Sequence, residues 1–131
     1  MNAKKSVHAL PVPSTSFTGE AYFNGQGISP SIRFSFNRNG VTYQSGITFS
    51  RVAAVRTRAE RCCQPWHIEG AYDTLVEVED SQWVDEIRAD TQKMWRETWQ
   101  MHHYMIYLDS VGCFEVIAES WDALPETPAT R

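Results

Sequence analysis

The chain has few cysteines and no long apolar run. Its three cysteines are an odd number, and two of them, Cys62 and Cys63, are adjacent. We therefore expect no disulfide framework, and a reducing cytoplasm is the expected location. No stretch reaches the ~18 apolar residues of a transmembrane helix. The N-terminal segment has no apolar core before its prolines, so it is not expected to be a signal peptide.

Several common functional signatures are also missing. The sequence contains no glycine-rich phosphate loop, no GxSxG motif, no CxxC motif and no HExxH motif, and this disfavours the common enzyme classes. The chain also has no excess of positive charge, since it contains 12 Lys and Arg but 16 Asp and Glu, for a formal net charge of −4. We therefore expect neither nucleic acid nor a membrane as a partner, because both attract positive charge.

Aromatic side chains are abundant. Five Trp, five Tyr and six Phe occur among 131 residues, of which 42% are hydrophobic. This composition is typical of a small globular domain, and aromatic residues in excess of the core can line a binding surface. Prolines and the absence of periodicity predict a flexible N-terminal tail at residues 1–16 and a flexible C-terminal tail at residues 125–131. A single α+β domain is expected between them, at residues 17–124.

Alternating apolar residues predict two β-hairpins. The first spans residues 31–50 around Asn39-Gly40, which is the strongest short hairpin signal. The second spans His102–Trp121 around the turn Asp109–Gly112, where Gly112 can supply a positive φ. Both faces of its first strand are apolar, as expected for a strand inside a sheet.

The remaining segments are less regular. Residues 51–63 fit a helix or a strand, and we favour a strand because both neighbours are strands. Short strands are expected at residues 17–23, 66–68 and 72–79, and the last hairpin begins at Trp99 or His102. An N-cap at Asp80 or Ser81 predicts one amphipathic helix over residues 81–96. Its expected buried stripe is Val84, Ile87, Thr91, Met94 and Trp95.

These elements predict an α+β fold. We expect a mainly antiparallel β-sheet of six or seven strands, with the single amphipathic helix packed on one face. In this layout the chain is similar to many small bacterial domains, and the similarity is one of architecture only, which does not determine function.

A zinc or iron site is the first chemical candidate, and we do not favour it. Its ligands would be Cys62, Cys63, His67 and His103, which are residue types that bind these metals. The spacings match no known zinc finger, and adjacent residues on a strand face opposite ways. The simpler interpretation is a partly buried cysteine pair, so we expect no cofactor.

A cysteine nucleophile is the second candidate. Cys113 could pair with His102 or His103 across the second hairpin. The nearby carboxylates of Asp109 and Glu115 would oppose formation of the thiolate, so a space-filling role is the preferred interpretation.

Arginines and carboxylates are clustered in the middle of the chain. If their segments are neighbouring strands, Arg56 and Arg58 would pair with Glu77 and Glu79, and we favour this slightly. Otherwise the two arginines would form a clamp for an anion.

The leading hypothesis is a small cytoplasmic binding or accessory protein of bacterial type. It would recognise a partner protein or a small anionic or aromatic ligand, as an inhibitor, an immunity protein or a biosynthetic accessory. The candidate binding residues are Arg56, Arg58, Trp66, His67, Tyr72 and His103. The alternative is a small enzyme, either metal-dependent through the residues named above or using His103 as a general base. The oligomeric state is left open, with a homodimer as one option.

Overall fold

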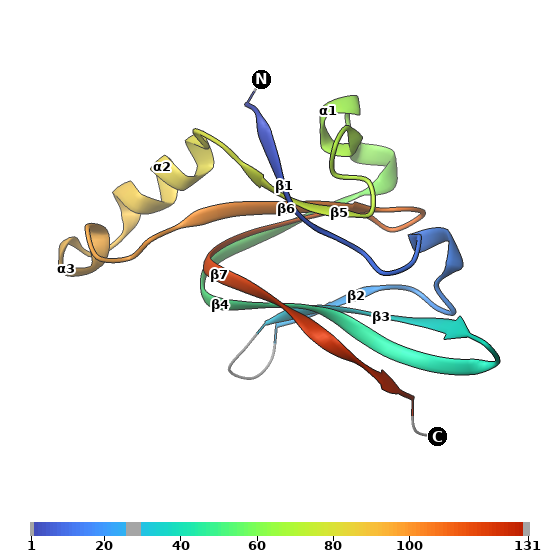
Figure 1. Ribbon diagram of the computed structural model, residues 1–131. Helices are drawn as coiled ribbons and strands as arrows, with labels where there is room; N and C mark the ends of the chain where they lie inside the picture. Colours follow the sequence, from blue (N-terminus) through green and yellow to red (C-terminus); the bar gives the residue numbers. More distant parts are fainter. Residues whose placement is uncertain (1, 26–29, 130–131) are drawn as a thin grey trace.

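The computed structural model describes residues 2–25 and 30–129. Its main feature is a seven-stranded antiparallel sheet with strand order β1-β5-β6-β7-β4-β3-β2 (Figure 1). The strands are β1 (Lys4–Ala9), β2 (Tyr22–Asn24), β3 (Ser31–Arg38), β4 (Val41–Ala59), β5 (Thr74–Val78), β6 (His102–Leu108) and β7 (Gly112–Pro128). The helices are short: α1 (Pro65–Ile68), α2 (Gln82–Asp90) and α3 (Lys93–Arg96). The predicted α+β class and antiparallel sheet are therefore confirmed.

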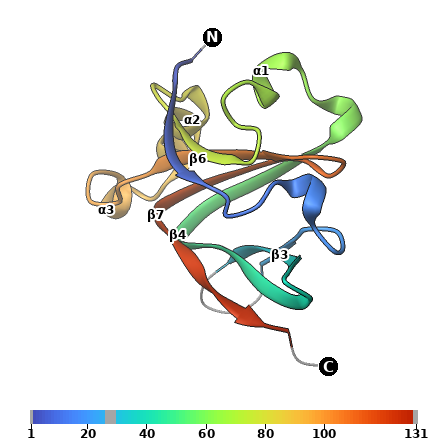
Figure 2. The same ribbon diagram turned by 45° about the vertical axis from the view of Figure 1, so that its right-hand side comes forward.

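The sheet is strongly curled. Strands β1, β5 and β6 lie above β2 and β3, while the long strands β4 and β7 curve from one group to the other (Figures 1 and 2). The rings of His8 in β1 and Trp121 in β7 meet across the curl, with centroids 5.0 Å apart. The larger apolar cluster, which includes Phe36, Phe49 and Ile106, lies on the inner face of this curl.

A second apolar cluster covers the outer face. Val76, Met105 and Tyr107 belong to it, and Trp66 and Ile68 of α1 pack against it. Strand β6 is therefore buried on both faces, as its sequence predicts.

Both predicted hairpin turns are confirmed. Asn39 and Gly40 have φ of 54° and 81° between β3 and β4, which is the pattern of a type I′ turn. Gly112 has φ of 130° at the start of β7, after Ser110 at 60°. Residues 51–59 continue β4, so the favoured strand interpretation of residues 51–63 is correct up to Ala59, after which Glu60–Cys62 form a short 3-10 helix.

Strand β4 bends where the sheet curls. Arg51 has φ of 53°, and the register with β7 shifts between Val52 and Ala54. Such a bulge increases the local twist of a strand and re-aims the residues that follow. Within the described residues, strand β3 pairs with β4 from Val41 to Thr48, so beyond the bend β4 is an edge strand paired with β7.

The expected single helix over residues 81–96 is wrong in extent. It is two helices, because α2 ends at Asp90 and Thr91 is extended, with ψ of 142°. The guanidinium of Arg96 folds back and donates to the carbonyls of Ala89 and Thr91. It thus provides hydrogen-bond donors for carbonyls at the end of α2, which have no partner within the helix. The expected buried stripe is wrong as well, since Met94 is 71% exposed and Trp95 50% exposed.

Parts of both segments expected to be tails belong to the sheet. Residues 4–9 form β1, which pairs with β5, and a register shift between Ser6 and His8 removes the alternation that would have identified it. At the other end, β7 continues to Pro128. Its prolines are tolerated because beyond Ala118 this strand pairs with β4 alone and no longer with β6.

Other short segments differ from expectation in detail. Residues 66–68 are helical rather than extended, since Pro65 occupies the first turn of α1, where its missing N–H costs nothing. The strand expected at residues 17–23 is confined to β2, with an isolated bridge from Phe17 to Phe36. The last hairpin begins at His102. None of the helices in the described residues has the length and apolar character to cross a membrane.

The start of β7 tolerates no side chain on its first residue. A Cβ on Gly112 would lie 2.1 Å from the carbonyl oxygen of Arg58, and its φ of 130° is one that other residues rarely adopt. We expect Gly112→Ala to lower the free energy of unfolding by about 1–3 kcal/mol or more. Urea denaturation followed by circular dichroism measures this. Gly19→Ala is the matched control, since no atom lies within 4 Å of its added Cβ, and equal stability of the two variants would contradict the prediction.

Candidate functional site

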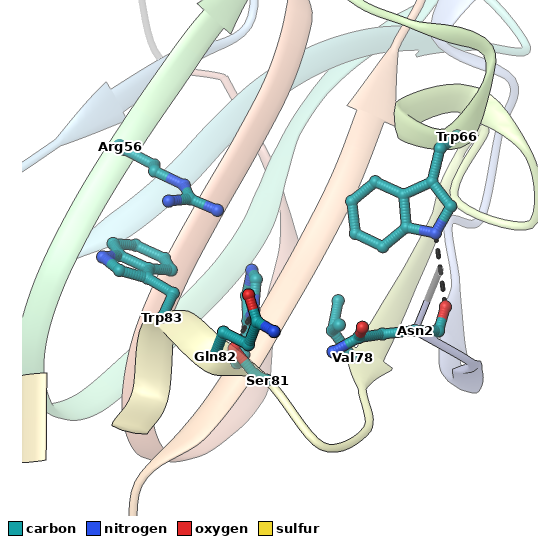
Figure 3. Close-up of a pocket in the computed structure, with 8 residues that line it drawn as sticks. Asn2, Arg56, Trp66, Val78, Ser81, Gln82 and Trp83 are labelled. Carbon is teal, nitrogen blue, oxygen red and sulfur yellow. Dashed lines mark hydrogen bonds between the residues drawn. The ribbon is translucent and has the colours of Figure 1, made fainter. Parts of the chain in front are cut away.

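A pocket of about 240 Å³ opens on the outer face of the sheet, between α1 and the start of α2 (Figure 3). Strand β4, strands β5 and β6, both helices and the N-terminal segment all contribute to it. It is lined by Asn2, Arg56, Trp66, Val78, Ser81, Gln82, Trp83 and His103.

Two of the lining residues, Arg56 and His103, bind a buried carboxylate, Glu115 of β7. Only 2% of its side chain is exposed. Arg56, its neighbour on β4, donates from Nε to Oε2 at 2.9 Å and from Nη2 to Oε1 at 3.1 Å. His103 of β6 lies on the other side, with Nε2 at 2.7 Å from Oε1. Three adjacent strands thus meet at one carboxylate.

These partners keep Glu115 ionised. Burial alone would raise the pKa of its carboxyl, but the hydrogen bonds from His103 and Arg56, together with the charge of Arg56, lower that pKa to about 2. An ionised carboxylate can only accept hydrogen bonds. The proton on Nε2 of His103 is therefore directed at Glu115.

The second ring nitrogen of His103 faces Ser81. Its Nδ1 lies 2.7 Å from Oγ of Ser81. In a neutral imidazole with the proton on Nε2, Nδ1 is an acceptor, so the hydroxyl of Ser81 donates to it. The same Oγ accepts the backbone N–H of Val84 at 3.2 Å and caps α2, as the sequence predicts for this residue.

Trp83 covers this network from the first turn of α2. Its ring meets the imidazole of His103 edge-on, with centroids 5.0 Å apart and planes at 78°. The guanidinium carbon of Arg56 lies 4.0 Å from the same indole ring, which is a cation–π contact. Arg56 is thus held from two sides, although 48% of its side chain remains exposed.

Trp66 forms the opposite wall of the pocket (Figure 3). Its Nε1 donates to the carbonyl of Asn2 at 3.2 Å, and the ammonium of Lys4 lies 4.4 Å from its ring centroid. Lys4 also donates to the carbonyls of Trp66 and Glu69. The segment expected to be a flexible tail therefore holds α1 in place.

The pocket includes half of the predicted binding residues. Arg56, Trp66 and His103 line it, whereas Arg58, His67 and Tyr72 are used elsewhere. Arg58 donates to the carbonyl of Cys62, Nδ1 of His67 accepts the N–H of Gln64, and the hydroxyl of Tyr72 donates to Asp109.

The expected pairing of Arg56 and Arg58 with Glu77 and Glu79 is wrong. Strand β4 lies between β3 and β7, whereas β5, which carries Glu77, lies between β1 and β6. The partner of Glu77 is His102, at 2.8 Å.

The cysteine candidates do not form a reactive site. Cys113 is buried and pairs in register with Tyr107 and Arg58 rather than with a histidine. Burial, helped by the charge of Glu115, raises the pKa of its thiol to about 12, which keeps it protonated. Across the described residues, no group of three or more His, Cys, Asp or Glu side chains is arranged to hold a metal ion, and Cys62, Cys63, His67 and His103 are not brought together.

Sequence reasoning missed the importance of Glu115, Trp83 and Asn2. Glu115 carried a signal, since it is the one charged residue in the apolar run from Val111 to Ala118. No local pattern links Trp83 or Asn2 to the site.

A separate groove of about 600 Å³ lies between β4 and α3, where it is lined by Arg51, Val52, Trp95, Thr98 and Trp99. It shares no residue with the pocket between α1 and α2.

In comparisons with known proteins, no family model matches this chain, and neither a curated protein nor a solved structure is detectably similar to it.

The depressed pKa of Glu115 predicts a specific dependence of stability on pH. The carboxylate stabilises the folded state above its ordinary pKa of 4.5, and this contribution is lost as the pH falls from 4.5 toward about 2. Near neutral pH, Glu115→Gln should lower the free energy of unfolding by about 2–4 kcal/mol, since Arg56 and His103 lose a charged acceptor. The difference in the free energy of unfolding between variant and wild type should become smaller as the pH is lowered. Urea denaturation at a series of pH values measures this.

Glu119→Gln is the matched control, because Glu119 pairs with the exposed Arg51 at 3.3 Å. Its effect should stay below about 1 kcal/mol at every pH. If both substitutions lowered the free energy of unfolding equally, the buried network around Glu115 would stabilise the fold no more than an exposed ion pair, which would contradict the prediction.

Proposed function

We propose that the protein binds a small aromatic anion in the pocket between Trp66 and Trp83. The observation that carries this proposal is the placement of two indole side chains, from separate helices, on opposite sides of one pocket beside an arginine (Figure 3). Flat aromatic ligands are bound by stacking or edge contacts with such rings, and a few polar groups then fix their orientation.

The size of the pocket suits a ligand of one or two rings. An apolar cavity of roughly 150 Å³ is sufficient for benzene, and this pocket measures about 240 Å³. The side chains of Asn2 and Gln82 at its rim provide amide donors and acceptors.

Arg56 supports the choice of an anion. Two of its nitrogens, Nε and Nη2, bind Glu115, and within the described residues its Nη1 has no hydrogen-bonding partner. The guanidinium is half-exposed on an edge strand, so a carboxylate can approach Nη1 from solvent.

Fluorine NMR of fluorotryptophan-labelled protein tests this proposal, because the chain has five Trp and each gives one resonance that a Trp→Phe variant assigns. Titration with naphthoate should shift the resonances of Trp66 and Trp83 and leave those of Trp95, Trp99 and Trp121 in place. Naphthalenemethanol, which lacks the charge, should bind about tenfold more weakly.

Two variants then show whether naphthoate binds in the pocket between α1 and α2 or in the groove between β4 and α3. Trp66→Ala should weaken naphthoate binding about tenfold, while Trp95→Ala, in the groove beside α3, should have no effect. Shifts confined to Trp95 and Trp99, or no shift at millimolar naphthoate, would refute the proposed ligand site.

A further inference from the structure

We propose that Ser81, His103 and Glu115 form a nucleophile–base–carboxylate triad that hydrolyses small esters at the pocket. The choice of an aromatic acyl group rests on the proposed function above. The triad itself rests on the geometry of three side chains.

The three side chains are linked by short hydrogen bonds. Oγ of Ser81 lies 2.7 Å from Nδ1 of His103, and Nε2 of His103 lies 2.7 Å from Oε1 of Glu115. A serine nucleophile needs a base within about 2.6–3.2 Å, and that base needs a third group to orient it. Ser81 and His103 both line the pocket, with 6% of Ser81 and 3% of His103 exposed.

The direction of the hydrogen bonds suits proton transfer. In the neutral imidazole whose Nε2 proton is donated to Glu115, the lone pair of Nδ1 faces the hydroxyl of Ser81. The two ring nitrogens have exchanged places relative to the chymotrypsin-type triad, in which Nε2 faces the serine. The chemistry requires only that one nitrogen accepts while the other donates to a carboxylate.

The position of Ser81 favours negative charge on its oxygen. It is the N-cap of α2, a nine-residue helix, and its Oγ accepts the N–H of Val84. The first N–H groups of a helix have no acceptor within the helix. Those of Gln82 and Trp83, two residues that line the pocket, are therefore placed to stabilise the oxyanion of a tetrahedral intermediate.

The reaction balances with water as the only co-reactant. Oγ of Ser81 attacks the ester carbonyl while its proton moves to Nδ1 of His103, and the resulting intermediate expels the alcohol, which takes that proton. Water then attacks the acyl–Ser81 ester and gives its proton to His103. The carboxylic acid leaves as His103 returns the proton to Ser81. Glu115 is a positioning residue throughout, since it touches only His103 and Arg56 among these groups.

The first test is labelling of the folded wild-type protein with a small alkyl phosphonofluoridate, a reagent that phosphonylates activated serines and releases fluoride. Tandem mass spectrometry should find the label on Ser81 alone. Ser14→Ala, which removes another buried serine, should label as fast as wild type. Ser81→Ala and Ser81→Asn should not label, and Asn retains the ability to cap α2 if loss of the cap destabilises the Ala variant.

The second test is hydrolysis of p-nitrophenyl naphthoate, followed by release of nitrophenolate. Ser81→Ala and Ser81→Asn should each lower the rate at least about 100-fold. In Glu115→Gln, nitrogen NMR of the imidazole should show the proton leaving Nε2 of His103, and labelling should slow at least about tenfold. If Glu115 only filled space in the core, its replacement by Gln would not change which ring nitrogen of His103 carries the proton.

Each failure has a distinct meaning. Absence of label on Ser81 in folded wild-type protein, or unchanged hydrolysis in Ser81→Asn, would overturn the triad, even if naphthoate still shifts Trp66 and Trp83. Labelling of Ser81 without any binding of naphthoate would support the triad and overturn the aromatic ligand instead.

Discussion

The constraint on which this structure depends is the burial of one carboxylate inside a sheet. Glu115 is 2% exposed in the buried first part of β7, where the other residues from Gly112 to Ala118 are apolar, and a buried charge is tolerated only with charged or hydrogen-bonding partners. Arg56 and His103 meet this requirement from the two flanking strands. Their pairing couples the register of β4, β7 and β6, because a shift of one residue in any strand would move its partner to the opposite face.

Much of the fold follows from local sequence signals. The Asn39-Gly40 turn and the positive φ of Gly112 were predictable because their residue types are those that the turns require. The strand nature of residues 51–59 followed from their neighbours. The signals failed in two places: a register shift interrupts the alternation of β1, and the extended backbone of Thr91 separates α2 from α3.

The candidate site was only half predictable, because it depends on strand order. Placing Arg56 beside Glu115 requires β4 to pair with β7, and the two residues are 59 positions apart. The same order explains the arginines of the middle segment. From Arg51 to Arg58 the strand is an edge, and edge strands carry charged residues that prevent pairing with other chains. Arg58 follows this pattern of charged residues on an edge strand.

The position of the pocket follows from the bend in β4. Before the bend at Arg51, β3 pairs with one edge of β4, and after the bend this edge is open within the described residues. The network around Glu115 is consequently buried on the side of β6 and reachable by solvent on the side of Arg56, whose side chain is 48% exposed. Buried polar groups keep a rigid geometry, whereas the open edge provides access without movement of a lid. Ser81 lies at this boundary, held by α2 and His103 yet lining the pocket. His103 thus binds the buried carboxylate through one ring nitrogen and the hydroxyl of Ser81 through the other, so the fold and the site share this residue.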